Sequence, residues 1–384
     1  MRRFWHGLFP PLSRQAFGRK FVERLRRQAP QPEPIYEGEA FRVVQGTTII
    51  QLGNFYEMYL RAPRWRRWSV LQEFLGLGFL NYSQAETWAE ARGQVLPKVR
   101  ERAFFWNIEE RLVEYPCELG PDLQAVLVLD MPGSCMYLPA KQLEEWNIPA
   151  TEAVRVARDN LWAQSQERFQ QAAPGLFVSP WQDSNDASRL VLGRLLEGLP
   201  VRGDALAVAP HRDIVLVGGS EDEEMLFQVL TGQLDVPYQL TPRPLRWDGE
   251  GWRAYQPRLP AWRSLLDSAE AMFYNEQVEY LQRTLTEDVA VMSVQSISRG
   301  GASTRVTTWA HDCVCLLPRA DWVVLQTGEP DPRCYAWDEF LARFTTSVRH
   351  EPDLLPPRWR TVSVPTPAEL EAAAWVGIDQ LLPP

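Results

Sequence analysis

The chain has 384 residues, 45% of them hydrophobic and 23% charged, so it can bury the cores of two or three domains and is not a wholly disordered chain. Its net charge of −9 argues against a protein that coats nucleic acid through general electrostatics. The five scattered cysteines do not resemble a secreted disulfide framework. No stretch approaches the roughly 18 apolar residues of a membrane span, so we expect a cytoplasmic protein without a transmembrane segment.

The first 30 residues predict a basic amphipathic helix. They hold eight Arg or Lys and one acid, a local net charge of +7. The apolar face is formed by Phe17, Phe21, Val22 and Leu25, which recur at helical spacing. Such a helix either packs into a core or lies on an anionic membrane surface, so peripheral membrane contact is one expectation.

Periodicity and turn residues predict small α+β modules along the rest of the chain. In chain order the predicted elements are strands within 41–52, a helix from 63, a strand at 125–129, a helix at 151–169, a strand at 176–178, a helix at 187–196, strands at 205–209 and 214–217, and a helix at 221–230. The turn His211-Arg212-Asp213 joins the last two strands and is expected to be solvated, which makes it a weak candidate for acid–base chemistry.

A proline-rich stretch at 237–260 separates this part from the C-terminus. It shows little apolar periodicity, so we expect a protease-sensitive connector with one hairpin that turns at Asp248-Gly249. The predicted class is α+β, with small mixed sheets and helices packed on them. The expected modules are 1–118 with the basic helix, 119–236, the connector 237–260 and a C-terminal module at 261–384.

Several scattered stretches resemble the YtpQ-like family of bacterial proteins of unknown function. They are FRVV at 41–44, LGNFYEMY at 52–59, PRWRR at 63–67, LPKVRERAF at 96–104, DL at 122–123 leading to LDMP at 129–132, LEEW at 143–146 and the helix at 157–161. The resemblance covers about 17–234 and excludes the C-terminal module. It implies a bacterial origin and an α+β fold, and it carries over no activity, cofactor or catalytic residue.

His311, Cys313 and Cys315 form an H-x-C-x-C alternation. On a strand the three side chains would share one face, and soft sulfur and nitrogen ligands could begin a zinc site. A fourth ligand is not evident, and cysteine is often simply buried. We therefore expect core packing, with no metal and no cofactor.

A glycine turn at Gly218-Gly219-Ser220 lies between a strand and a helix, where phosphate loops occur. The acids that follow would repel a phosphate. They favour instead a capping box with Ser220 as N-cap and Glu223 at N3.

Arg64, Trp65, Arg67 and Trp68 form a second basic cluster, interleaved with aromatic residues. The simplest explanation is an amphipathic helix whose Trp residues face the core while the Arg side chains extend to solvent. The alternative is a binding surface, and Trp and Arg are the residues of protein–protein hot spots. We expect another protein as partner and no nucleic acid.

The sequence offers no nucleophile motif, and its four histidines are scattered. We therefore expect a non-catalytic interaction or regulatory protein. The alternative is an enzyme with a carboxylate- or histidine-based site between modules.

Overall fold

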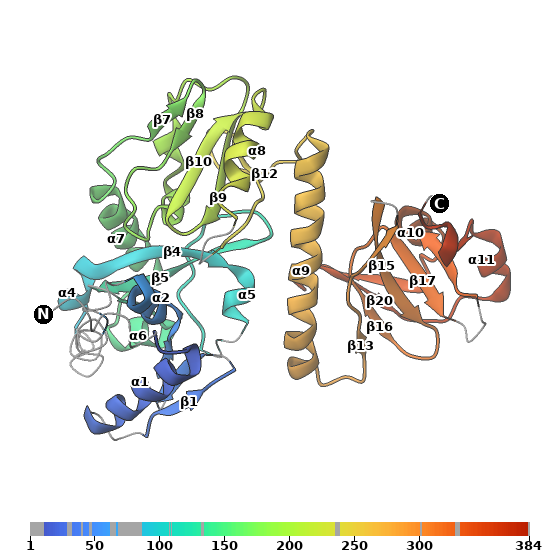
Figure 1. The fold of residues 1–384 in the computed structure, drawn as a ribbon, viewed down its shortest axis with the longest axis horizontal. Coiled ribbons are helices and arrows are strands. Elements are labelled where there is room, and N and C mark those ends of the chain that lie inside the picture. The colour runs from blue at the N-terminus through green and yellow to red at the C-terminus, as the bar shows by residue number, and fades with distance from the viewer. Residues whose placement is uncertain are drawn as a thin grey trace, which may run out of the picture. The chain divides into compact units, whose positions relative to one another are not determined.

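The computed structural model describes residues 11–28, 33–39, 41–45, 48–61, 67, 87–106, 108, 110–131, 134–234, 239–299, 302–326 and 331–382. The chain divides into two compact units, Met1–Glu90 and Ala91–Pro384. The predicted α+β class is confirmed, because helices alternate with several small sheets along the chain (Figure 1). In the described part of the chain, no helix is both long and apolar enough to cross a membrane.

The first unit packs two helices against a small antiparallel sheet. Its elements are α1 (Arg14–Gln28), β1 (Ile35–Glu37), β2 (Arg42–Gln45), β3 (Thr48–Gln51) and α2 (Gly53–Arg61), with strand order β1-β2-β3. Gly18 allows the close approach of α1 to β1, since a Cβ there would lie 2.3 Å from the Tyr36 ring.

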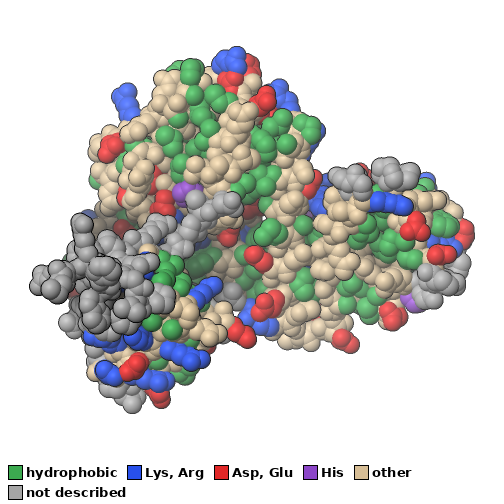
Figure 2. Space-filling view, in the orientation of Figure 1, with side chains coloured by type: hydrophobic (Ala, Val, Ile, Leu, Met, Phe, Trp, Pro, Cys, Tyr) green, Lys and Arg blue, Asp and Glu red, His purple; other side chains and the backbone are tan. Residues whose placement is uncertain are grey.

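The predicted basic helix is confirmed as α1. All four residues of its apolar face are buried in the core of this unit, together with Phe41 and Tyr59. Lys and Arg side chains gather over the outer side of the helix (Figure 2). The apolar face is therefore already used inside the protein and is not available for insertion into a membrane.

The second unit begins with a three-stranded antiparallel sheet and its helices. Helix α4 (Trp88–Ala91) spans the boundary between the two units. The elements that follow are η1 (Arg92–Gln94), β4 (Val95–Glu101), α5 (Arg102–Phe105), β5 (Leu123–Met131), β6 (Ser134–Tyr137), α6 (Ala140–Glu145) and α7 (Ala150–Ala163), with order β4-β5-β6. Strand β4 pairs with β5 along its whole length. The chain therefore does not divide after 118, where we expected a boundary.

A six-stranded antiparallel sheet follows, in the order β12-β11-β9-β10-β8-β7. Its elements are β7 (Gln170–Ala173), β8 (Leu176–Val178), η2 (Ala187–Leu196), β9 (Ala205–His211), β10 (Ile214–Gly219), α8 (Glu223–Thr231), β11 (Leu245–Trp247) and β12 (Trp252–Ala254). The predicted helix at 187–196 is a 3-10 run interrupted by non-helical backbone at Leu192.

The expected connector is part of this sheet. The predicted hairpin is present as β11 and β12, with Gly249 at φ +94° in the turn, and β11 also pairs with β9. Trp252 is buried, and its Nε1 donates to the carbonyl of Leu190 at 2.6 Å. The prediction of a loosely held connector was wrong, because backbone pairing and tryptophan burial hold this segment in place.

Glu223 has a different role from the predicted one. Ser220 Oγ accepts from the Asp204 N–H at 2.9 Å, so it does not cap α8. The buried Glu223 carboxylate accepts from the N–H groups of Arg258 and Leu259 at 2.8 and 3.1 Å, at the start of α9 (Pro260–Thr284). The predicted capping box was wrong, and Glu223 instead satisfies donors just ahead of the next helix.

The rest of the unit consists of two further sheets with an aromatic core. The elements are β13 (Ala290–Val291), β14 (Gln295–Arg299), β15 (Ala302–Ala310), β16 (Cys315–Leu317), β17 (Trp322–Gln326), β18 (Arg333–Ala336), α10 (Trp337–Arg343), β19 (Val348–Glu351), β20 (Arg358–Thr361), α11 (Pro367–Ala372), β21 (Val376–Gly377) and η3 (Ile378–Gln380). The strand orders are β13-β16-β20-β19 and β14-β15-β17-β18-β21. Trp309, Tyr335 and Phe340 are buried together in this core.

Candidate functional site

Lys98 and Arg100 lie on one face of β4. Side chains alternate along a strand, so both share the face of Leu96, which packs against Val128 of β5 and Tyr137 of β6. A strand therefore carries two cations at alternate positions on a face that otherwise forms a hydrophobic core. Such placement is costly unless the charges have partners.

Lys98 is held by a loop from a distant part of the sequence. Only 3% of the residue is exposed, and Nζ donates to the Ser184 carbonyl at 2.7 Å and to Asn185 Oδ1 at 2.6 Å. The pKa of Lys98 is lowered to about 8, mainly by burial and with a contribution from the charges of Arg100 and Arg212, while Cys135 and Asp130 oppose the change. The buried amine therefore loses its proton at a pH much nearer neutrality than an exposed lysine does.

The loop at 179–186, between β8 and η2, holds unusual backbone conformations. Gln182 and Ser184 have φ values of 49° and 66°, a region that residues other than glycine seldom adopt. Asp183 clamps the loop by accepting two hydrogen bonds from the buried Arg189, at 2.9 and 2.7 Å. Lys98 and Arg189 together stabilise this conformation.

Two carboxylates near the amine are poorly solvated. Burial raises the pKa of Asp130, and the charge of Lys98 and a hydrogen bond with Asn185 partly oppose that shift. Burial also raises the pKa of Asp186, which is fully buried, and among the described residues its Oδ1 has no hydrogen-bond partner.

Arg100 reaches toward β6 on the same face. Its Nε donates to the Tyr137 hydroxyl at 3.0 Å, and its guanidinium lies 5.7 Å from the Phe104 ring centre. Burial raises the pKa of Tyr137. Among the described residues, the two terminal nitrogens of Arg100 make no hydrogen bond, so they remain available to an incoming acceptor.

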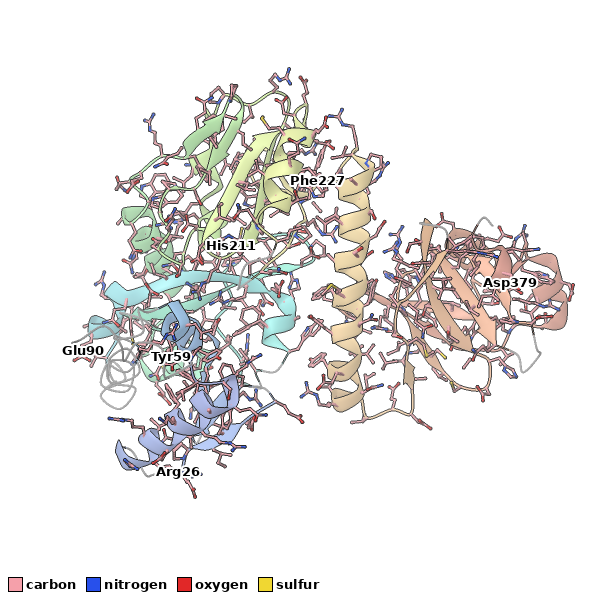
Figure 3. The ribbon with its side chains drawn as sticks, in the orientation of Figure 1. Arg26, Tyr59, Glu90, His211, Phe227 and Asp379 are labelled. Carbon is pink, nitrogen blue, oxygen red and sulfur yellow. The ribbon has the colours of Figure 1, made fainter. Side chains whose placement is uncertain are left out.

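The turn His211-Arg212-Asp213 belongs to the same cluster. We expected it to be solvated, yet the His211 and Arg212 side chains are only 12% and 16% exposed. The Arg212 carbonyl accepts from the Ala187 N–H at 3.1 Å, which ties the turn to η2. Figure 3 labels His211 at the end of β9; its Nδ1 accepts from the Asp213 N–H at 3.2 Å, so Nδ1 carries no proton in this arrangement. The expectation of a solvated turn was wrong because the hairpin packs against η2.

These residues, Lys98, Arg100, Asp130, Tyr137, Asn185 and Arg212, are named the Lys98 site. It brings together three cations and one carboxylate whose pKa is raised, with Asp213 as a second carboxylate acting on Arg100. Titratable groups that converge from distant segments are typical of functional sites. The excess of positive charge and the available guanidinium nitrogens suit an anionic ligand.

The lowered pKa of Lys98 predicts how stability depends on pH. The folded pKa of about 8 lies below the ordinary value of 10.5, so between these values only the unfolded chain holds the proton and stability rises with pH. Relative to Lys98→Met, the wild type should gain about 2 kcal/mol of unfolding free energy between pH 7 and pH 10. Urea unfolding at both pH values measures this difference. The matched control is Lys141→Met, at an exposed lysine, which should show no such gain; parallel pH curves for wild type and Lys98→Met would contradict the assignment.

A second feature lies where β4 and α5 meet α9. Trp106 stacks on Phe273 and Tyr280 of α9, with ring centres 5.1 and 5.5 Å apart. A cavity of about 290 Å³ opens here, lined partly by Arg102, Trp106, Tyr280 and Leu355. Burial raises the pKa of Glu101 to about 8, and the charges of Glu276 and Asp122 add to the shift. Two carboxyl groups therefore face each other at a packed junction.

The predicted binding cluster is only partly covered by the structure. Arg64, Trp65 and Trp68 lie outside the described residues. Arg67 is half-buried and donates to the Leu60 carbonyl at 3.1 Å, with its guanidinium 5.8 Å from the Tyr59 ring centre. This side chain packs back onto the preceding helix.

The expected core packing is confirmed for Cys315, which is fully buried, and is wrong for Cys313, which is exposed. Strand β15 ends at Ala310 and β16 begins at Cys315, so His311 and Cys313 occupy a turn. His311 Nδ1 bonds the Gln326 carbonyl at 2.9 Å. Within the described residues, no three His, Cys, Asp or Glu side chains are grouped as a metal site would require. The three side chains do not share one strand face, because β15 ends before His311 and the first cysteine.

Lys98, Arg100 and Asp130 were not predicted as site residues from the sequence. The sequence feature that could have indicated them is the pair Lys98 and Arg100, two cations at alternate positions of a segment whose apolar residues predict a buried strand. Both lie in the stretch 96–104, and Asp130 lies in 129–132, two of the stretches on which the family resemblance rests. Comparison of the chain with protein-family models, with curated proteins and with solved structures finds no match.

Proposed function

We propose that this protein is a non-catalytic regulatory protein that binds a small carboxylate- or phosphate-bearing anion at the Lys98 site. The observation that carries the proposal is the convergence of Lys98, Arg100 and Arg212, with terminal guanidinium nitrogens of Arg100 that make no hydrogen bond among the described residues. A planar guanidinium beside a buried amine matches the oxygens of such an anion.

Ligand binding at this site is coupled to proton uptake. A bound anion favours the charged form of Lys98 and so raises its pKa from about 8. Affinity should therefore fall as the pH rises above 8, where the free protein loses this proton. Such coupling gives a regulatory protein a response to both ligand and pH.

Titration calorimetry with inorganic phosphate, acetate and citrate at pH 7 tests the proposal. At least one of these anions should bind saturably, and Arg100→Met should weaken that binding about tenfold or more, since a charge-assisted hydrogen bond contributes ~1.5–3 kcal/mol. The matched control is Arg168→Met, at an exposed arginine of the same unit, which should bind as the wild type does. Equal affinities of the two variants, or no saturable binding of any of the three anions, would reject the site.

The second candidate is an enzyme with a histidine- or carboxylate-based site. It is favoured by His211, whose Nδ1 is unprotonated, and by Asp130 with its raised pKa, both beside the cations. NMR of the bound anion after prolonged incubation separates the two functions. A regulatory site returns the anion unchanged, whereas turnover that is lost in His211→Ala identifies an enzyme.

A regulatory function also requires a partner that senses the ligand-bound state, and we propose that this partner is a protein. We further propose a cytoplasmic location, a bacterial origin and membership of the YtpQ-like family. Support comes from the stretches 96–104 and 129–132, which carry both the resemblance and the residues of the Lys98 site.

A further inference from the structure

Two thiols lie in contact at the surface of the C-terminal sheets. The sulfur atoms of Cys313 and Cys315 are 3.7 Å apart. All five cysteines are among the described residues, and Cys313 alone is exposed, while Cys315 is fully buried. One accessible thiol thus lies directly against an inaccessible one.

The backbone around the pair fixes one cysteine more firmly than the other. Cys315 opens β16, and its N–H donates to Thr361 Oγ1 at 2.8 Å. Cys313 lies in the turn that leaves β15, with its sulfur 4.0 Å from the Ala310 carbonyl. A disulfide needs an S–S distance of about 2.05 Å. Displacement of the exposed turn toward β16 can provide this closure without moving the strand.

We propose that Cys313 and Cys315 are a redox-active dithiol that is oxidised by low-molecular-weight disulfides. The Cys313 thiolate attacks one sulfur of the oxidant, breaking its S–S bond and releasing the first thiolate. Cys315 then attacks the Cys313 sulfur and passes its proton to the second thiolate as that thiolate leaves. Two electrons pass from the protein to the oxidant, the two released thiolates take up the two protons, and one S–S bond forms in the protein.

The order of these steps follows from exposure. A soluble disulfide can reach Cys313, and it cannot reach the buried Cys315. Burial also raises the pKa of Cys315 to about 12, so this thiol stays protonated and is not the group that attacks the oxidant first. An exposed protein disulfide is of the labile, reducible kind, which suits a reversible switch.

Intact-mass analysis after incubation with oxidised glutathione tests the inference. The wild type should lose two hydrogens and retain no glutathione, because Cys315 displaces it. Cys315→Ser should keep one glutathione on Cys313, and Cys313→Ser should undergo neither change. Cys334→Ser, which removes another buried cysteine, should behave as the wild type does.

A second measurement on the wild type makes the test independent of how Cys315→Ser folds. After oxidation and unfolding, alkylation should label Cys117, Cys135 and Cys334 and spare the proposed pair, and reduction should restore labelling of all five. A lasting glutathione adduct on the wild type, or alkylation of Cys315 after oxidation, would overturn the inference.

Discussion

Replacing Arg358 by alanine is expected to lower the free energy of unfolding by about 4 kcal/mol. Arg358 is fully buried on β20, and its guanidinium donates to Gln277 Oε1 at 2.6 Å, to the Tyr274 carbonyl at 2.8 Å, and to the carbonyls of Met292 and Leu316 at 2.7 and 3.1 Å. The side chain thereby joins α9 to the sheets that follow. Its loss leaves a cavity and removes four charge-assisted hydrogen bonds.

The arrangement is unusual because all four acceptors are neutral. Burial lowers the pKa of Arg358 to about 10, which shows how strongly the site disfavours the charge. Part of the loss in Arg358→Ala is therefore offset by relief of this desolvation. We expect the cavity and the unsatisfied Oε1 of Gln277 to outweigh it, because Gln277 is itself buried.

Urea unfolding followed by tryptophan fluorescence measures the effect. Arg349→Ala is the control, because Arg349 lies on the neighbouring strand β19 and pairs with Glu351 at the surface. It should change the free energy of unfolding by no more than ~0.5 kcal/mol. If Arg358→Ala is as stable as this control, Arg358 does not hold the junction together.

Replacing Glu101 by glutamine is expected to abolish a fall in stability with rising pH. The folded pKa of Glu101, about 8, lies above its ordinary value of 4.5 because of burial and the facing Glu276. Between these values the folded protein holds a proton that the unfolded chain has lost, so the wild type loses stability as the pH rises toward 8. Glutamine stays neutral at every pH and keeps the shape of the protonated acid.

The two proteins should therefore be equally stable to within about 1 kcal/mol near pH 5, and Glu101→Gln should be more stable by about 4 kcal/mol near pH 9. Thermal or urea unfolding across this range measures the difference. Glu167→Gln is the control, at an exposed carboxyl group, and should follow the wild type at both ends. A difference between Glu101→Gln and wild type that does not change with pH would show that Glu101 ionises normally in the folded protein.

Local patterns in the sequence predicted the fold class and most of the individual helices and strands. The spacing of Phe17, Phe21 and Leu25 predicted α1 and its buried face, and the apolar run at 125–129 predicted the centre of β5. Asp248-Gly249 predicted the turn of the β11–β12 hairpin. These features depend on residues that are neighbours in the chain, so local periodicity and turn chemistry are sufficient to specify them.

The functional clusters form only when segments that are distant in the sequence fold together. Lys98 donates a hydrogen bond to Asn185, which lies 87 residues further along the chain. Glu223 accepts a hydrogen bond at the start of α9 instead of capping its own helix. A polar residue in an apolar strand must have a partner, but the sequence does not show which distant loop supplies it. The segment 237–260 likewise shows little apolar periodicity in the sequence, yet its strand β11 pairs with β9, a contact that no local pattern encodes.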